Sequence, residues 1–186
     1  MAAPAHSHDS LPLNRLGLWL FFASESMIFA ALLTTRFVLL GTSRPEGLNQ
    51  ALGLGLTAVL LLSSVSAYSA EASIAQGKRT AFLLYLVATI VLGTVFLVGV
   101  VGFEWREAAA MGISYQSGYG IAYFSMTGMH ALHVLSGIVL LGLVLLNGRR
   151  GAYSPENYWG VEAVIKYWHF VDLVWVFFYP ALYLIM

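Results

Sequence analysis

Long apolar segments alternate with short polar links along the whole chain. The apolar segments run over residues 16–40, 48–70, 80–103, 119–146 and 161–185. Each has the length of about 20 mostly apolar residues that an α-helix needs to cross a hydrocarbon core about 30 Å thick. Membrane-spanning β-strands would be about half as long and would alternate apolar and polar residues. The pattern therefore predicts an all-α integral membrane bundle of five transmembrane helices, with an irregular tail at residues 1–15.

Composition agrees with a single membrane domain that covers residues 1–186. Of the 186 residues, 59% are hydrophobic and 10% are charged, whereas about 25% of residues are charged in ordinary globular domains. The formal net charge is zero, so nothing indicates a nucleic-acid partner. The absence of cysteine excludes disulfides, iron–sulfur clusters and thiolate metal sites. We expect no cleaved signal peptide, because the tail is weakly charged and no small-residue cleavage site follows the first apolar run.

The distribution of lysine and arginine predicts the orientation in the membrane. One side of the predicted bundle, with the tail and the second and fourth links, holds Arg15, Lys78, Arg79, Arg149 and Arg150. The other side holds Arg36, Arg44 and Arg106. Because basic residues concentrate on the cytoplasmic side, we expect a cytoplasmic amino terminus and an outer carboxyl terminus.

The last apolar segment carries a row of polar residues. Glu162, Lys166, His169 and Asp172 follow one another at steps of four, three and three, which places them on one face of a helix. A charged group near the bilayer centre costs roughly 2.5–3.5 kcal/mol. We therefore expect this face to meet polar groups of other helices, and Glu162 and Lys166 to neutralise each other at the cytoplasmic end.

His130 and His133 lie three residues apart on one face of the fourth predicted helix. They can ligate a metal or haem, or they can hydrogen-bond neighbouring helices. Two histidines so spaced cannot occupy opposite axial positions of one haem, so His169 would have to contribute, and a copper or zinc site would need further ligands.

Glu25 lies near the middle of the first predicted helix, and two interpretations remain open. It is either a proton-exchanging carboxyl, which is the default hypothesis for an intramembrane acid, or a protonated carboxyl that a hydrogen bond holds in place. His6 and Arg15 precede or begin this helix at the expected cytoplasmic surface. They either contact anionic lipid headgroups or merely solvate the tail.

Four blocks of the sequence, taken together, resemble subunit III of the haem–copper respiratory oxidases, the family of cytochrome c oxidase subunit 3 and quinol oxidase subunit 3. They are GLWLFFASESMIFAAL (17–32), LLSSVSAYSAEASIAQGKR (61–79), GYGIAYFSMTGMHALHVLSGIVLL (118–141) and VEAVIKYWHFVDLVWVFFYPALY (161–183). Glu104 also matches a glutamate of the family. Longer members have two additional amino-terminal helices, so the chain is similar to the short five-helix bacterial form.

The resemblance implies a non-catalytic subunit of a proton-pumping terminal oxidase in the bacterial plasma membrane. Such a subunit binds no haem or copper itself; those cofactors belong to partner subunits. It packs mainly against subunit I, with subunit II as a further partner, and holds structural phospholipids in a cleft while supporting proton uptake and oxygen access. Membership of a larger respiratory supercomplex and the electron donor, cytochrome c or quinol, stay open.

The same resemblance assigns positions to the candidate residues. Glu25 would face the lipid cleft, and His6 and Arg15 would lie near lipid headgroups. The remaining polar residues of the spans would form a seam inside the bundle: His130, His133, Glu162, His169 and Asp172. Two other functions remain as alternatives, a haem-binding membrane anchor that uses His130 or His133 with His169, and a small proton-coupled transporter that uses Glu25 and Asp172.

Overall fold

The computed structural model describes residues 11–40 and 49–185, and nearly all of them are helical. The elements are α1 (Leu11–Leu40), α2 (Gln50–Ala75), α3 (Arg79–Val98), the π-helical segment η1 (Gly99–Glu104), α4 (Trp105–Ala110), α5 (Gly118–Arg149), α6 (Trp159–Tyr179) and the π-helical segment η2 (Pro180–Leu184). No strand occurs in these two ranges, so the prediction of an all-α membrane bundle is confirmed.

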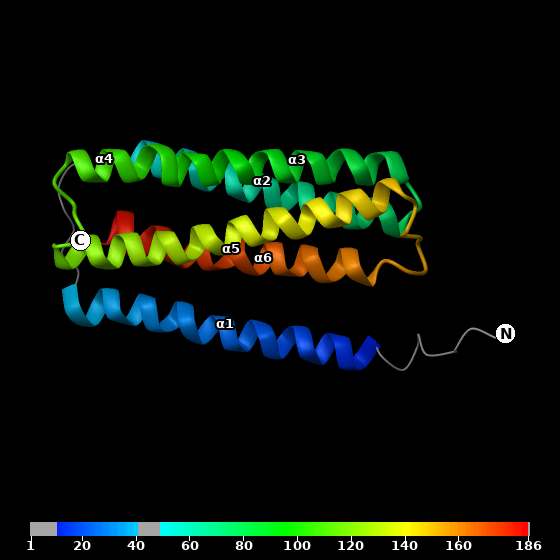
Figure 1. Cartoon of the computed structure of the whole chain (residues 1–186), viewed down its shortest axis with the longest axis horizontal. Coiled ribbons are helices and arrows are strands. Elements are labelled where there is room, and N and C mark those ends of the chain that lie inside the picture. The colour runs from blue at the N-terminus through cyan, green and yellow to red at the C-terminus, as the bar shows by residue number, and fades with distance from the viewer. Residues whose placement is uncertain (1–10, 41–48, 186) are drawn as a thin grey trace.

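Four helices form a closed bundle, and α1 lies outside it (Figure 1). Helix α2 packs against α3 and α6, and α5 packs against α3 and α6, so the four enclose a common core. Helix α1 makes its main contacts with α5 and α6. Only 11% of the apolar span of α1 is buried, against 28 to 33% for the spans of α2, α3 and α5. Most of α1 is therefore left for lipid or a partner protein to cover.

Among the described residues, four helical stretches are long and apolar enough to cross a membrane, namely those of α1, α2, α3 with α4, and α5. Helix α6 has 21 residues but carries Glu162, Lys166 and Asp172. Its position inside the bundle, in contact with α2 and α5, explains how these polar residues are accommodated.

The helices extend further than the apolar pattern predicts. Helix α1 begins at Leu11 instead of residue 16, because Pro12 in the first turn needs no hydrogen-bonded N–H. The third helix does not end near residue 103 but continues through η1 and α4 to Ala110, where consecutive alanines favour helix. Much of the predicted polar link at 104–118 is thus helical.

Two tryptophans of α6 occupy the centre of the four-helix bundle. Trp168 and Trp175 are completely buried. The Nε1 atom of Trp168 donates a hydrogen bond to Ser63 Oγ (3.0 Å), and that of Trp175 donates to Thr57 Oγ1 (3.0 Å), both on α2. Because the indole N–H finds a partner in each case, these bulky side chains fill the core without leaving an unpaired donor. They are core residues and not part of an interfacial belt.

Candidate functional site

Glu25 and His133 join α1 to the bundle. The Oε2 atom of Glu25 lies 3.0 Å from Nε2 of His133, and the side chains are 18% and 14% exposed. Phe29, one turn beyond Glu25, packs edge-on against the His133 ring at 4.7 Å between centroids. The polar contact between α1 and α5 is therefore shielded by an aromatic ring from the same helix.

The second nitrogen of His133 restricts the protonation state of the pair. Nδ1 lies 2.9 Å from the backbone oxygen of Met129. A carbonyl oxygen can only accept, so Nδ1 must carry a proton. The contact with Glu25 then holds one shared proton, either on the carboxyl, which donates to Nε2, or on Nε2, which donates to the carboxylate. In both forms the pair has no net charge, which suits its place in the apolar span.

His130, one turn before His133, behaves differently. It is completely buried, and neither ring nitrogen has a hydrogen-bond partner among the described residues. Its ring packs against Phe96, Trp175 and Phe178, with centroids 5.7, 4.9 and 6.4 Å away. Of the two interpretations of the histidine pair, hydrogen bonding to neighbouring helices does not hold for His130 within the described residues, because α3 and α6 present aromatic rings to it.

Arg15, Glu162 and Lys166 form a charged cluster at one end of the groove between α1 and α6. Lys166 donates to Oε1 of Glu162, and an Nη atom of Arg15 lies 3.6 Å from the same oxygen. Both cations also lie over the ring of Trp159, at 5.6 Å for Arg15 and 5.8 Å for Lys166. The structure thus shows the expected pairing of Glu162 with Lys166 and adds Arg15 from α1. The cluster carries one net positive charge.

His169 and Asp172 face α2 instead of this cluster. Nδ1 of His169 lies 2.7 Å from Ser64 Oγ. Asp172 is buried, and Ser64 is the side chain that interacts with its carboxyl, although neither carboxyl oxygen has a hydrogen bond of regular geometry within the described residues. The serine-rich end of the second span therefore supplies polar groups to the last helix.

The polar residues predicted from the sequence consequently lie in separate places. Glu25 and His133 lie between α1 and α5, Glu162 lies in the charged cluster, and His169 and Asp172 lie between α6 and α2. His130 stands apart among aromatic rings. His6 falls outside the described residues. No group of three or more histidine, aspartate or glutamate side chains in the described ranges is arranged to hold a metal ion.

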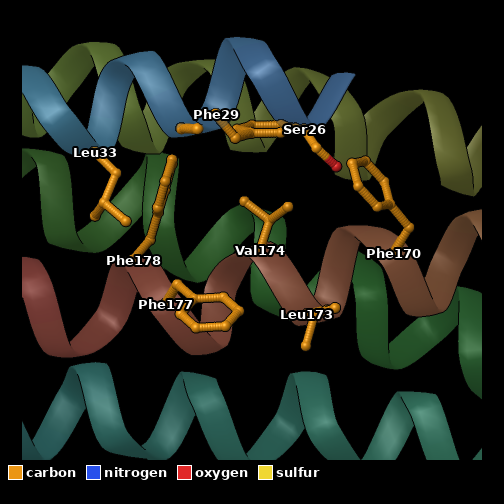
Figure 2. A pocket seen from close by; sticks show the side chains of 9 residues that line it. Ser26, Phe29, Leu33, Phe170, Leu173, Val174, Phe177 and Phe178 are labelled. Atoms are coloured by element: carbon orange, nitrogen blue, oxygen red, sulfur yellow. The ribbon is translucent and has the colours of Figure 1, made fainter. Parts of the chain in front are cut away.

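An apolar groove runs along α1 and α6 in two adjoining hollows of about 510 and 290 Å³ that share Ser26, Phe170 and Leu173. The larger hollow begins at Lys166 and Trp19, and the smaller one ends at Leu33 and Phe177. Figure 2 shows Leu33, Phe29 and Ser26 of α1 on one side of the smaller hollow, with Phe178, Val174 and Phe170 of α6 on the other. The groove is therefore apolar along its walls and basic at the end that Lys166 borders.

Two buried polar groups were not predicted as sites. Arg36 is completely buried and lies over the Tyr119 ring at 5.3 Å, although its place in the sequence indicated only the orientation of the chain. Glu104 is 4% exposed and accepts a hydrogen bond from Tyr183 (2.7 Å). Its match to a family glutamate was the only signal in the sequence, because the apolar pattern placed it in a polar link.

Comparisons with known proteins agree with this architecture of a polytopic membrane bundle. The family model of cytochrome c oxidase subunit III matches residues 5–185. Cytochrome c oxidase subunit 3 of Corynebacterium diphtheriae is 35% identical, over 91% of this chain and 87% of its own length. The probable quinol oxidase subunit 3 of Staphylococcus aureus is 33% identical, over 93% and 89%. Cytochrome c oxidase subunit 3 of Salmo salar is 40% identical over 68% of this chain, which is 48% of the fish protein.

The family model covers nearly the whole chain, including both α1 and α6, and the two bacterial relatives each cover more than nine tenths of it. The chain belongs to the cytochrome c oxidase subunit III family, and hence to the subunits III of the haem–copper oxidases.

Proposed function

We propose that this chain is the non-catalytic subunit III of a bacterial haem–copper terminal oxidase, with its amino terminus in the cytoplasm. In this role it packs against subunit I, near subunit II, and holds phospholipid along α1 while it supports proton uptake and oxygen access. Haem and copper belong to the partner subunits. The names of the full-length bacterial relatives support the assignment to an oxidase.

The groove between α1 and α6 is the observation that carries the lipid part of the proposal. Its walls are apolar, and residues on its rim such as Leu173 and Phe177 are largely exposed. In a bilayer such a groove is filled by hydrocarbon, because water is absent at that depth. An acyl chain lying between α1 and α6 would add contact area to the helix that the bundle buries least.

The charged cluster gives the groove a polar end. Lys166 borders the larger hollow, and Arg15 lies on the same cluster with more than half of its side chain exposed. Basic side chains at the cytoplasmic surface attract anionic headgroups, by about 1 kcal/mol each. We therefore propose an anionic phospholipid with its phosphate near Lys166 and Arg15 and one acyl chain in the groove.

The two alternative functions have less support in the geometry. A haem anchor that uses His133 with His169 would need a free ring nitrogen, but Nε2 contacts Glu25 and Nδ1 contacts Met129. In the version that uses His130, both ring nitrogens are without a partner among the described residues, but the ring is completely buried among Phe96, Trp175 and Phe178, which occupy the space that a haem would need. A transporter that uses Glu25 and Asp172 would need a polar path between them, whereas Glu25 pairs with α5 and Asp172 faces α2.

The assignment to an oxidase is tested by purifying the chain through a tag in a gentle detergent. We expect a large polytopic subunit to co-purify and to bring a haem absorption spectrum with it. Recovery of the chain alone and colourless, from cells that express an oxidase, would favour the transporter. Recovery of the chain alone with bound haem would favour the anchor.

The lipid site is tested separately by quantifying phospholipids in the purified complex by mass spectrometry. Ala30→Trp inserts a ring into the smaller hollow, and Lys166→Gln removes the charge that borders the larger one. We expect both to lower the retained anionic phospholipid. Ala58→Trp, on an exposed position of α2, and Arg150→Gln, at an exposed position outside the cluster, are matched controls. Unchanged lipid in both groove variants would refute the site while leaving the oxidase assignment intact.

A further inference from the structure

The π-helical segment η1 determines which residues of the third helix face the core. Successive buried residues of α3, from Phe82 to Phe96, are separated by alternating steps of four and three residues, and Val100 continues this spacing. An uninterrupted α-helix, at 3.6 residues per turn, would keep Glu104 on the buried side and would next bury Glu107. With the wider π turn, Glu104 is buried, Ala108 is buried in place of the exposed Glu107, and Phe103 is 61% exposed. Such turns are frequent at functional sites, and this one ends at the buried carboxyl of Glu104 and leaves Glu107 facing outward.

Tyrosines from two other elements supply hydrogen bonds to this carboxyl. The hydroxyl of Tyr183, in η2, donates to Oε2 of Glu104 at 2.7 Å. The hydroxyl of Tyr123, in α5, lies 2.9 Å from that of Tyr183. A chain of hydrogen bonds therefore connects α5, the carboxyl-terminal segment and η1 at the end of the bundle that carries α4 (Figure 1).

The second carboxyl oxygen of Glu104 has no such partner. Oε1 is buried and makes no hydrogen bond to any residue in the described ranges. An ionised carboxylate needs a donor at this oxygen, and a protonated carboxyl needs an acceptor or a donor there, so neither protonation state is satisfied. A buried oxygen without a partner costs about 1–3 kcal/mol. Water is the usual partner for such a group.

A small cavity lies where the missing partner is needed. Its volume is about 10 Å³, close to the lower limit for one water molecule. It is lined by Glu104, Tyr123 and Tyr183 on the buried side and by Asn49, Glu107 and Met111 on the exposed side. The Asn49 side chain uses Oδ1 to accept from Leu52 N, so its amide nitrogen can still donate. The cavity thus joins the buried carboxyl to the surface.

We propose that this cavity binds one exchangeable water molecule that hydrogen-bonds Oε1 of Glu104 and connects it to the surface at Glu107 and Asn49. Glu104 is then a buried carboxyl with aqueous access, and so able to exchange a proton with the water at this end of the bundle. The site is separate from the Glu25–His133 pair and from the groove between α1 and α6. It does not depend on the proposed lipid.

Hydroxyl-radical labelling by a short X-ray pulse tests the proposal, because radicals formed from a bound water oxidise the side chains beside it. The sample is the purified complex, or the chain in lipid nanodiscs. Tyr183 and Tyr123 are each 1% exposed, and bulk water does not reach them. Met126 and Trp175 are completely buried and line none of the cavities described. Because methionine and tryptophan side chains react readily with hydroxyl radicals, these two residues are internal controls for labelling in the absence of a nearby water.

We expect mass spectrometry to find oxidised Tyr183 or Tyr123, with Met126 and Trp175 unmodified. In H₂¹⁸O the added oxygen should be ¹⁸O, because the water exchanges with solvent. Glu104→Leu should abolish the labelling of these tyrosines, and Glu104→Gln, which keeps a polar partner, should retain it. If Tyr183 and Tyr123 of the wild type are as unmodified as Met126, the proposed water site is overturned. This result does not depend on whether the Glu104→Leu variant folds. Label that remains ¹⁶O would overturn the connection to the surface.

Discussion

Nε2 of His133 lies 3.0 Å from Oε2 of Glu25, although 108 positions separate the two residues in the chain. This contact links α1 to α5 of the four-helix bundle, as the Arg15–Glu162 pair links α1 to α6. Since Nδ1 of His133 donates to the Met129 carbonyl, the pair shares one proton and has no net charge. The arrangement accommodates both interpretations of Glu25, a carboxyl that exchanges its proton and one that a hydrogen bond holds in place.

Glu25→Gln should leave the complex assembled and its stability within about 1 kcal/mol of the wild type, since the amide can donate to or accept from Nε2. Glu25→Leu leaves Nε2 without its partner and should lower stability by about 1–3 kcal/mol. Thermal melting of the purified complex in detergent measures both. If Glu25→Gln dissociates as readily as Glu25→Leu, the hydrogen bond alone does not hold α1, and an ionised pair is required.

His130 and His133 should respond oppositely to replacement by phenylalanine. His130→Phe removes two unpaired buried nitrogens from an aromatic environment and should leave stability unchanged or raise it by about 1 kcal/mol. His133→Phe removes the link to Glu25 and should lower the melting temperature. Haem and copper analysis of the same samples is the control, with unchanged content expected in both. A loss of haem or copper in His130→Phe would identify a ligand role and contradict the packing role described above.

Gly93→Ala should destabilise the bundle core. A Cβ atom at Gly93 would lie 2.5 Å from a ring carbon of Trp168, which is held by its hydrogen bond to Ser63 and is also closely approached by Gly137. Overpacking of this kind costs about 1–3 kcal/mol. Gly142→Ala on α5 is the matched control, because nothing lies within 4 Å of its Cβ position. It should be neutral or stabilising by up to about 1 kcal/mol. Equal melting temperatures for the two variants would show that Trp168 can move aside.

Glu162→Gln should increase the amount of anionic phospholipid bound at the groove, the opposite of Lys166→Gln. Removal of the carboxylate takes away the ion-pair partner of Arg15 and Lys166 and raises the net charge of this three-residue cluster from one to two. A further unit of charge near the membrane surface is worth about 1 kcal/mol, or roughly fivefold in binding. Competition with labelled anionic and zwitterionic lipids measures the change, and the exposed Glu156→Gln serves as control. A decrease in anionic lipid would mean that Glu162 positions the two cations and that their charge alone does not suffice.

The existence of the helical spans is a property of the sequence alone, because hydropathy over about 20 residues is a local quantity that needs no knowledge of the neighbours. The same holds for the polar residues within the spans. Glu25, His133 and Asp172 are conspicuous in apolar surroundings, so each could be identified as a candidate. The row on α6 could also be placed on one face from its spacing.

The partners of these residues were decided by the tertiary structure. The row from Glu162 to Asp172 extends roughly 15 Å along α6, far enough for its two ends to meet different elements, with Arg15 of α1 at one end and Ser64 of α2 at the other. His130 and His133 are equivalent in the sequence pattern, yet one meets aromatic rings and the other a carboxyl.

Glu104 shows most clearly what the sequence pattern could not determine. The apolar pattern places Glu104 in a polar link, whereas the helix continues through η1 and buries this carboxyl beside Tyr183. The π turn of η1 lies where Gly99 approaches Leu56 of α2, and a Cβ atom at Gly99 would be 2.2 Å from a Leu56 methyl. Local periodicity thus determines which segments are helices. The direction in which each side chain points depends on how neighbouring helices pack together. The energy of that packing comes from contacts between residues that are distant in the chain.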